Sequence, residues 1–437
     1  MKDPRIITGF SRLSKDEKVD LVSGHVKLPR KFAETLRSAW HRDPQVQKLY
    51  DEFSENTLSN YYFPYGVSPN FLINGKLYIV PLVIEESSVV AAASGAAKFW
   101  AERGGFHSEV LSMKKTGQVH FLWKADITPL QQAFPSLKQR LLEHTHPITE
   151  NMKLRGGGIL DIELVNMTAL IPDYYQIKGT FDTRDSMGAN FINSCLEEFA
   201  DQLKEFVAED KRFDESRLEI IMSILSNYTP ECRVRTWVEC DMGKQQGFDD
   251  NFTDQDFIRR FSTAVSIAHV DVYRASTHNK GIFNGIDAVA LATGNDFRAM
   301  EACGHTWAAR DGQYRSLSEV SLVDGKFRFS VDIPLALGTV GGLTNLHPLA
   351  KYSLELLGNP GAEELMQIAS AAGLANNYAA VKSLVTKGIQ KGHMKMHLLN
   401  ILNVFNATDQ EKELAVDFFK HEKVTFNTVS KFLENIR

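Results

Sequence analysis

Val89 to Glu102, with the sequence VVAAASGAAKFWAE, points most directly to the fold. Alanine, serine and glycine fill many of its positions, a composition that favours a helix to which another backbone can pack closely. We therefore expect a small-residue helix at the centre of a domain. Before it, Leu77 to Ile84 is an apolar, β-branched run that predicts a buried strand, and Tyr61 to Asn74 is rich in turn residues.

On either side of this region the pattern changes. Asp16 to Val22 and Phe32 to Trp40 have the spacing of amphipathic helices. From Gly117, strands alternate with helices over roughly a hundred residues, which predicts an inserted α/β domain. The expected strands are Val119 to Ile127, Leu160 to Leu170 and Tyr175 to Thr183, and the expected helices are Leu137 to Glu143 and Phe191 to Val207.

The remainder of the chain predicts a return to the first domain and a hinged end. From Ala264 the sequence is again rich in small residues and glycine. The Pro360–Gly361 pair begins a helical stretch that we expect Gly373 to interrupt. Gly388 and Gly392 then precede a final amphipathic region, and a segment bounded by two glycines can act as a hinge.

Composition limits the classes of function. With 437 residues, 43% of them hydrophobic, the chain can bury a large core in two or three domains. A net charge of -5 argues against nucleic acids and anionic membranes as partners. The first ten residues lack a signal-peptide pattern and no long apolar run occurs, so we expect a cytoplasmic protein. Four cysteines without CxxC spacing predict reduced core residues and no structural zinc.

The first of four segments with candidate chemistry is Glu85-Glu86-Ser87-Ser88, between the predicted strand and the small-residue helix. Apolar surroundings and a second carboxylate both disfavour ionisation, so a carboxylic acid here can donate a proton to a developing alkoxide. The alternative is that these residues cap the helix and interact with its dipole. The segment by itself favours capping.

The second segment runs from Arg274 to Gly285 and is followed by Thr293-Gly294-Asn295-Asp296. Lys280, held by a neighbouring carboxylate, can stabilise negative charge on a carbonyl oxygen. Arg274 has a planar fork suited to a substrate carboxylate. The alternative is a solvated loop with an ordinary Lys–Asp surface pair. The almost wholly apolar run from Ile286 to Ala292 makes a solvated location less favourable.

The third segment, Asp182 to Asn190, ends a predicted strand and opens a predicted helix. Small residues at such a junction let backbone amides approach a phosphate at the positive end of the helix dipole. A plain tight turn explains the same residues equally well. The GxGxxG fingerprint is absent, so the sequence does not support a Rossmann fold.

The fourth segment runs from Lys387 to His397. His393, beside Gly392, could swing over a site and protonate a leaving thiolate near neutral pH. The alternative is a polar surface residue. His393 and His397 also have the spacing of a metal pair, but no HExxH pattern and no third ligand accompany them, so we expect no metal.

Together the four segments resemble the class II, bacterial-type hydroxymethylglutaryl-coenzyme A (HMG-CoA) reductases. Such enzymes carry, in chain order, Glu-Glu-Pro-Ser, Asp-Ala-Met-Gly-Ala-Asn, His-Asn-Lys-Gly, Thr-Gly-Asn-Asp and Gly-His-Met segments. This chain reproduces the order, and the resemblance extends from about Arg12 to the C-terminal region. It implies the reversible, two-step, four-electron reduction of HMG-CoA to mevalonate and coenzyme A with two NAD(P)H, in the mevalonate pathway of isoprenoid biosynthesis.

Two other functions are alternatives to this one. The first is a single-hydride NAD(P)-dependent dehydrogenase of another acyl-CoA or aldehyde. The second is a catalytically inactive acyl-CoA-binding protein, against which the intact ionisable residues of the four segments argue.

The resemblance also implies roles for individual residues. Asp296 is expected to hold Lys280 charged and to couple it to Glu86. The implied catalytic residues are Glu86, Lys280, Asp296 and His393; the implied contacts to the hydroxymethylglutaryl group are Arg274, Thr277, Asn284 and Ser88; and the implied contacts to the nicotinamide cofactor are Asp185, Met187, Gly188 and Asn190.

The fold implied by the resemblance is α+β. A large, mostly helical domain with a central Ala-rich helix is interrupted by a small α/β, non-Rossmann cofactor-binding domain and followed by a mobile C-terminal helical flap. We expect the large domain over residues 1–112 and 219–387, the small domain over 113–218 and the flap over 388–437. The resemblance also implies a homodimer, or a higher oligomer built from dimers, with the active site at the subunit interface, and no nucleic-acid or membrane partner.

Three positions depart from the family pattern. Ser87 stands in place of proline, Ser186 in place of alanine, and Ser59 in place of the glycine of a Glu-Asn-x-x-Gly segment. None of these removes a reacting group. At Ser59, the access of glycine to positive φ is lost, which predicts a local change of backbone geometry.

The region before Gly156 bears on the choice of cofactor. Where an NADH-using relative has an aspartate that binds the adenosine ribose, this chain has Thr149, and Lys153 and Arg155 follow it closely. Loss of the carboxylate together with nearby cations favours a 2′-phosphate, and therefore NADPH over NADH.

Overall fold

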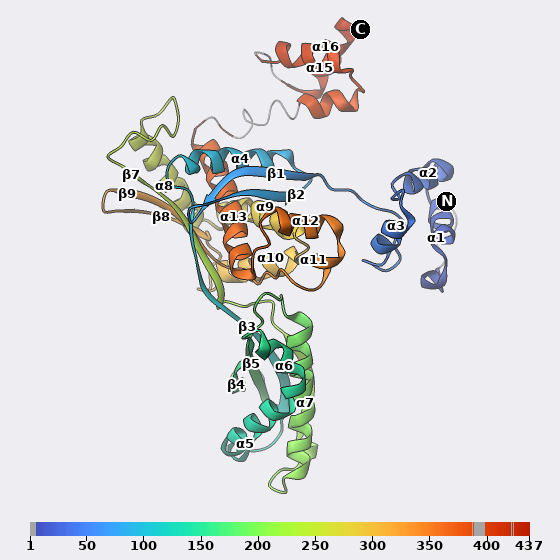
Figure 1. The fold of residues 1–437 in the computed structure, drawn as a ribbon, viewed down its shortest axis with the longest axis vertical. Helices are drawn as coiled ribbons and strands as arrows, with labels where there is room; N and C mark the ends of the chain where they lie inside the picture. The colour runs from blue at the N-terminus through green and yellow to red at the C-terminus, as the bar shows by residue number, and fades with distance from the viewer. Residues whose placement is uncertain (1–5, 387, 389–397, 421, 423) are drawn as a thin grey trace. The chain divides into compact units, whose positions relative to one another are not determined.

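The computed structural model describes residues 6–386, 388, 398–420, 422 and 424–437 (Figure 1). Two compact units result, Met1–Pro64 and Tyr65–Arg437. The first is helical, and two of its helices confirm the helices predicted over Asp16 to Val22 and Phe32 to Trp40. Its elements are η1 (Phe10–Arg12), α1 (Lys15–Ser23), α2 (Pro29–Ser38) and α3 (Pro44–Asp51). The hydroxyl of Ser59 donates to the carbonyl of Leu36 (2.6 Å), and its φ is not positive, so serine causes no backbone strain here.

The second unit contains two sheets. β1 and β2 form a hairpin, and the other strands have the order β4-β5-β3-β7-β9-β8, with β6 also paired to β3. Every named strand pair in the described residues is antiparallel, so this is not the parallel sheet of a Rossmann fold. The strands are β1 (Tyr65–Ile73), β2 (Lys76–Val83), β3 (His107–Trp123), β4 (Gly158–Asn166), β5 (Tyr174–Asp182), β6 (Leu218–Leu225), β7 (Cys232–Asp241), β8 (Ser318–Val323) and β9 (Lys326–Pro334).

Strand β1 corrects the sequence-based expectation of a turn-rich segment over Tyr61 to Asn74. The pairing with β2 is interrupted between Ser68 and Phe71, and Asn70 in this interval has a φ of 68°. The turn residues therefore form a bulge inside a strand, which absorbs proline and a left-handed residue without ending the pairing.

Helices cover these sheets, and α13 is the most deeply buried of them. Ala93, Ala96 and Ala97 of α4 are buried in the same core, which confirms a small-residue helix in the interior, although α4 packs on β1 and against α13 instead of being the central helix itself. The helices are α4 (Ser87–Ala101), α5 (Thr128–His144), α6 (His146–Leu154), α7 (Ala189–Glu209), η2 (Glu215–Arg217), α8 (Asp254–Val270), α9 (Val272–Ala292), α10 (Phe297–Ala308), α11 (Leu343–Leu346), α12 (Pro348–Leu356), α13 (Ala362–Val385), α15 (Asp409–Phe418) and α16 (Phe426–Ile436).

Helices α9 and α13 approach each other unusually closely. A Cβ atom on Gly285 of α9 would lie 2.3 Å from the carbonyl oxygen of Ala372 on α13. A Cβ atom on Gly373 would lie 3.0 Å from the carbonyl oxygen of Ile282. The expectation that Gly373 interrupts a helix is therefore wrong: α13 continues through it, and the glycine serves close packing.

Strand β3 belongs to two hydrophobic cores. Its first part, His107 to Met113, pairs with β7 at the main core, and its second part pairs with β5 and β6 beside a smaller core. The smaller core includes buried side chains from β3, β5, α5 and α7. The predicted change of domain at residues 112 and 113 falls inside this strand (Figure 1), and the domain boundaries stay a prediction.

The C-terminal residues from 398 onward contain a short helix (398–404), α15 and α16, which share a hydrophobic core of their own. Leu402, Ala415 and Val429 are completely buried within it. None of the helices that the structure describes is long and apolar enough to span a lipid bilayer.

Gly285→Ala should destabilise the protein by roughly 1–3 kcal/mol, because the added methyl group has no room against α13. Gly95→Ala is the matched control: Gly95 lies in α4, where an added Cβ would meet no atom within 4 Å, and the change should stabilise by roughly 0.4–1 kcal/mol. Thermal unfolding of both variants measures the difference. Equal midpoints would contradict the close approach of α9 and α13.

Candidate functional site

One face of α9 carries the polar residues of the second segment. Arg274, Thr277, Lys280 and Asn284 follow one another at intervals of three and four residues, so their side chains project from neighbouring positions on the helix. The segment is thus a helix and not the solvated loop considered from the sequence. Burial lowers the pKa of Arg274, but a guanidinium group stays charged at any physiological pH. The side chain of Lys280 is 65% exposed.

The opposite face of α9 is fixed by buried hydrogen bonds. The side-chain Nδ2 of Asn279 donates to the backbone carbonyl of Arg315 (2.8 Å), and its Oδ1 accepts from the backbone amide of Leu317 (2.9 Å). The amide side chain of Asn377 on α13 donates to the carbonyl of His278 (3.1 Å). In the His-Asn-Lys-Gly segment, histidine and asparagine therefore anchor the helix, and lysine is the residue presented outward.

His278 is buried as a neutral base. Its Nε2 lies 2.6 Å from the hydroxyl of Ser318, whose proton is donated to Asn377, so Nε2 carries the hydrogen. In the part of the chain that the structure describes, Nδ1 of His278 has no hydrogen-bond partner. Burial, reinforced by the charge of Arg274, lowers the pKa of His278 to about 3. A charge on this ring would have nothing to stabilise it.

Glu86 meets Lys280 across the start of α4. Lys280 Nζ lies 3.7 Å from Glu86 Oε2, and the hydroxyl of Ser88 donates to Glu86 Oε1 at 2.5 Å. Glu86 occupies the N-cap position of α4, but its side chain forms no capping hydrogen bond. The side-chain capping considered from the sequence is therefore not formed by Glu86. The Glu86 side chain is 42% exposed, so its surroundings are less apolar than the sequence predicts.

Within one chain, the partners of Asp296 are residues of α10 and not Lys280. Its carboxylate caps α10, accepting from the amides of Arg298 and Ala299, and pairs with the Arg298 guanidinium at 3.0 Å. Although burial acts in the opposite direction, these hydrogen bonds lower the pKa of Asp296. Lys280 and the end of α9 at Ala292 are roughly 18 Å apart along the helix axis. In the described residues of one chain, Lys280 pairs with Glu86 and Asp296 pairs with Arg298.

The third segment forms a turn between β5 and α7, as predicted. Gly188 has a φ of 86°, and a Cβ atom there would lie 2.4 Å from the side chain of Thr183, so only glycine fits. Asp185 Oδ1 accepts from the amide of Ala362 at the start of α13 (2.7 Å). Met187 packs against the main core, whereas Asn190 is exposed.

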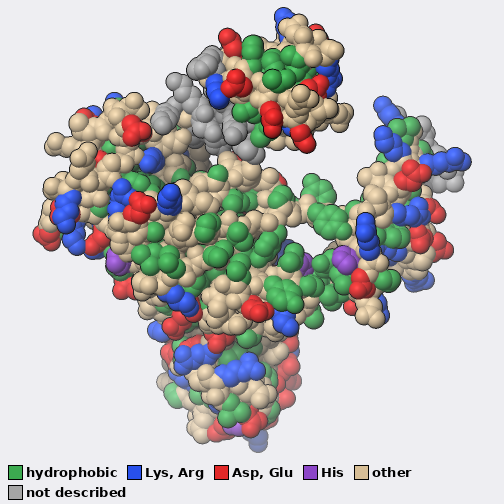
Figure 2. Space-filling model, turned by 45° about the horizontal axis from the view of Figure 1, so that its top comes forward, with side chains coloured by type: hydrophobic (Ala, Val, Ile, Leu, Met, Phe, Trp, Pro, Cys, Tyr) green, Lys and Arg blue, Asp and Glu red, His purple; other side chains and the backbone are tan. Residues whose placement is uncertain are grey.

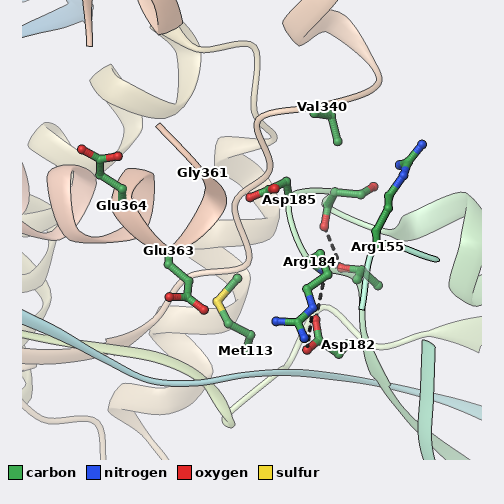
Figure 3. Close-up of a pocket in the computed structure, with 11 residues that line it drawn as sticks. Met113, Arg155, Asp182, Arg184, Asp185, Val340, Gly361, Glu363 and Glu364 are labelled. Carbon is green, nitrogen blue, oxygen red and sulfur yellow. Dashed lines mark hydrogen bonds and ion pairs between the residues drawn. The ribbon is translucent and has the colours of Figure 1, made fainter. Parts of the chain in front are cut away.

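A cavity of about 530 Å³ adjoins this turn (Figure 3). Its volume lies in the range of small-molecule sites. Glu363 and Glu364 line one side, and Arg155 and Arg184 line the other. Arg184 is bound to the carbonyl of Gly156 (2.6 Å), whereas the guanidinium of Arg155 has no hydrogen-bond or ion-pair partner in the described residues. The turn therefore combines a position that only glycine can occupy with an adjoining cavity that is lined by both guanidinium and carboxylate groups.

Two features of the site are not expected from the sequence reasoning. Asn295 binds both backbone groups of Gly338, at 2.8 and 3.0 Å, and a Cβ atom on Gly338 would lie 2.4 Å from the amide nitrogen of Met187. The glycine-rich run Gly338 to Gly342 is the signal that could have identified this segment. On α9, burial together with nearby Glu301 raises the pKa of Asp287.

His393 lies outside the described residues, and its predicted role is not tested by the structure. The same holds for His397. In the described part of the chain no group of three or more histidine, cysteine, aspartate or glutamate residues has metal-binding geometry.

Comparisons with known proteins agree with one another. The family model described as hydroxymethylglutaryl-coenzyme A reductase matches residues 22–398. The 3-hydroxy-3-methylglutaryl-coenzyme A reductase of Archaeoglobus fulgidus is 33% identical over 436 residues, covering 99% of this chain and 94% of that protein. A probable enzyme of the same name from Borreliella burgdorferi is 32% identical over 407 residues, covering 91% and 90%.

Solved structures give the same result. The class II enzyme from Streptococcus pneumoniae bound to NADPH in open conformations has a TM-score of 0.70 and 36% identity, covering 87% of this chain and 99% of that one. A second structure of the enzyme from this organism has a TM-score of 0.71 and 34% identity, covering 98% and 99%.

The stability of the protein should decrease as the pH falls from about 6.5 towards 3. In this range the unfolded chain protonates His278 and the folded chain does not, so the unfolding free energy decreases by about 1.4 kcal/mol per pH unit for this group. His278→Gln removes the titration and should give a shallower decrease between pH 6.5 and 5, measured by thermal unfolding. The exposed His25→Gln should keep the wild-type slope. Identical slopes for all three proteins would contradict the buried neutral ring.

Proposed function

Because this chain belongs to the hydroxymethylglutaryl-coenzyme A reductase family, we propose that it reduces HMG-CoA to mevalonate and coenzyme A with two NAD(P)H. One observation carries the proposal: Lys280 Nζ lies 3.7 Å from Glu86 Oε2, on the helix face that also bears Arg274 and Asn284. A cation and a proton donor are thereby adjacent, as the reduction of a carbonyl group requires.

The chemistry divides between this chain and its cofactor. Bound NAD(P)H would supply hydride to the thioester carbon and then to the aldehyde carbon. The ammonium group of Lys280 stabilises the negative charge on the carbonyl oxygen in each reduction. Glu86 donates the proton that completes the alcohol, and the hydroxyl of Ser88 orients its carboxyl group. We assign to His393 the protonation of the departing coenzyme A thiolate.

The substrate is held along α9. The guanidinium of Arg274 binds the free carboxylate of the hydroxymethylglutaryl group as a planar, charged fork. Thr277 and Asn284 supply hydrogen bonds to the same group from the next turns of the helix, and Ser88 contributes from α4.

The cofactor is held by the turn after β5, with Asp185, Met187, Gly188 and Asn190 along the nicotinamide half. We propose NADPH as the preferred cofactor. Thr149 is completely buried and leaves no carboxylate to repel a 2′-phosphate, whereas Arg155 lines the adjoining cavity without a partner among the described residues. Lys153 is exposed nearby and adds positive charge.

The proposed enzyme is a homodimer in which Asp296 of the partner subunit completes the site. Within the described residues of one chain, Asp296 pairs with Arg298 and not with Lys280. Exposed hydrophobic side chains on the second unit (Figure 2) are typical of a protein interface. On β1, β2 and the adjoining α12 they include Val67, Leu77, Ile79, Leu349, Tyr352 and Leu356.

We also propose a cytoplasmic location. The four cysteines are buried free thiols, the state that a reducing compartment maintains.

Incubation of the purified protein with HMG-CoA should oxidise two molecules of NADPH for each coenzyme A released. A ratio of one would indicate a single-hydride dehydrogenase, and no turnover would indicate a binding protein. Lys280→Met should lower kcat by about 10²–10³-fold, because the developing negative charge loses its cation. Lys98→Met, on the exposed face of α4, is the control and should retain full activity.

Mixing inactive Lys280→Met with inactive Asp296→Asn should restore about a quarter of the wild-type activity. Half of the dimers would be mixed, and one of their two sites would combine an intact lysine with an intact aspartate. Glu86→Gln mixed with Lys280→Met is the control: these residues meet within one chain, so no activity should return. Activity measured after subunit exchange distinguishes the two pairs. Failure of the first pair to recover would contradict the shared site.

Arg155→Ala should raise the KM for NADPH by about tenfold, because a charged contact to the 2′-phosphate is lost. The KM for NADH is the internal control and should change by less than about twofold. Steady-state kinetics with both cofactors measures the ratio. An equal loss with both would assign Arg155 to the shared part of the cofactor, or to structure alone.

A further inference from the structure

Lys115 of β3 is buried in an unusual way. In the part of the chain that the structure describes, it is the one lysine, arginine, aspartate or glutamate whose whole residue is buried, with 2% exposure. Removing an ammonium group from water is expensive unless hydrogen bonds compensate for it. Burial lowers the pKa of Lys115, and the carboxylates of Asp182 and Asp185 act against that shift.

The compensating hydrogen bonds all come from one turn. Lys115 Nζ donates to the hydroxyl of Thr183 (2.5 Å) and to the carbonyl of Ser186 (2.8 Å). The Thr183 hydroxyl in turn donates to the same Ser186 carbonyl at 2.6 Å. The ammonium group, the hydroxyl and the carbonyl form a closed triangle beneath the segment between β5 and α7.

Further hydrogen bonds within the turn involve the same residues, Thr183 and Ser186. The amide of Ser186 donates to the carbonyl of Thr183 (3.0 Å), and the amide of Gly188 donates to the hydroxyl of Ser186 (3.1 Å). Gly188 contacts Thr183 so closely that a side chain cannot be added there. From the other side, Gly338 packs against the backbone of Met187. Thr183 and Ser186, which bind Lys115, are thus also the residues that form the hydrogen bonds within the turn.

We propose that Lys115 is a positioning residue for the nicotinamide cofactor, which it does not touch, because it fixes the turn that presents Asp185, Met187 and Gly188. This inference rests on the proposed function of that turn. Filling space in the core does not explain a lysine at this position. An apolar side chain of similar length would fill the same space without the desolvation penalty of a buried charge. The ammonium group donates two hydrogen bonds that an apolar side chain cannot replace.

The test compares Lys115→Met with Lys114→Met in the full-length protein. Lys114 is the neighbouring residue on β3, half exposed and paired with Glu231 at 3.1 Å, so its loss should leave the turn unchanged. Hydrogen exchange of the peptide covering residues 183–190 reports the turn directly. Titration with NADPH alone, followed by its fluorescence, reports cofactor binding without any reaction.

Lys115→Met should accelerate exchange in this peptide and weaken NADPH binding by about tenfold or more, while the KM for HMG-CoA changes by less than about threefold. Thr183→Val should reproduce the loss, and Thr183→Ser, which keeps the hydroxyl, should restore binding. Unchanged exchange or unchanged NADPH affinity in Lys115→Met would overturn the proposal, as would equal losses for both substrates. Wild-type protein that binds NADPH but does not turn over HMG-CoA would overturn the proposed reaction and leave the role of Lys115 standing.

Discussion

The contact between α9 and α13 is the constraint on which the site depends. Gly285 lets the two backbones approach to a distance that no side chain would allow, and Gly373 does the same from the other helix. The hydrogen bonds of His278, Asn279 and Asn377 then fix the rotation of α9 about its own axis. Because the rear face is fixed in this way, Lys280 must project from the opposite face, towards Glu86.

A second set of contacts joins this helix to the turn after β5, where we propose that the cofactor binds. Asn295, just after α9, binds the backbone of Gly338, and Gly338 packs on Met187. Asp185 then reaches the first amide of α13, the helix against which α9 packs. The proposed substrate face and the proposed cofactor turn are thus both positioned by contacts with α9 and α13. These contacts involve backbone atoms and leave little space for adjustment.

Several regular elements could be predicted from the sequence, because their periodicity is strong. Strands β2 and β5 and helices α4 and α7 lie within a few residues of the predicted ranges. The errors arise where a residue has two uses. Proline and asparagine in β1 form a bulge instead of a turn, and Gly373 permits packing instead of ending a helix.

The candidate site was predictable in residue type and less so in arrangement. The adjacency of Lys280 and Glu86 follows from the family resemblance and agrees with the geometry. The separation of Lys280 from Asp296 could not be predicted, because the sequence does not indicate that α9 continues without a break from Lys280 to Ala292. Lys115 has no sequence signal either: its neighbour Lys114 has the same side chain, and only the alternation of the strand distinguishes buried from exposed.

Strand β3 also limits how this chain can evolve in length. One uninterrupted segment supplies hydrogen bonds to β7 in one core and to β5 and β6 in the other. An insertion or deletion near its middle would turn every following side chain to the opposite face of the sheet, so that Val119, Phe121 and Trp123 would leave the smaller core together. A change in the number of residues near the middle of β3 would therefore need a compensating β-bulge, such as the one that the strand already has between Val110 and Ser112.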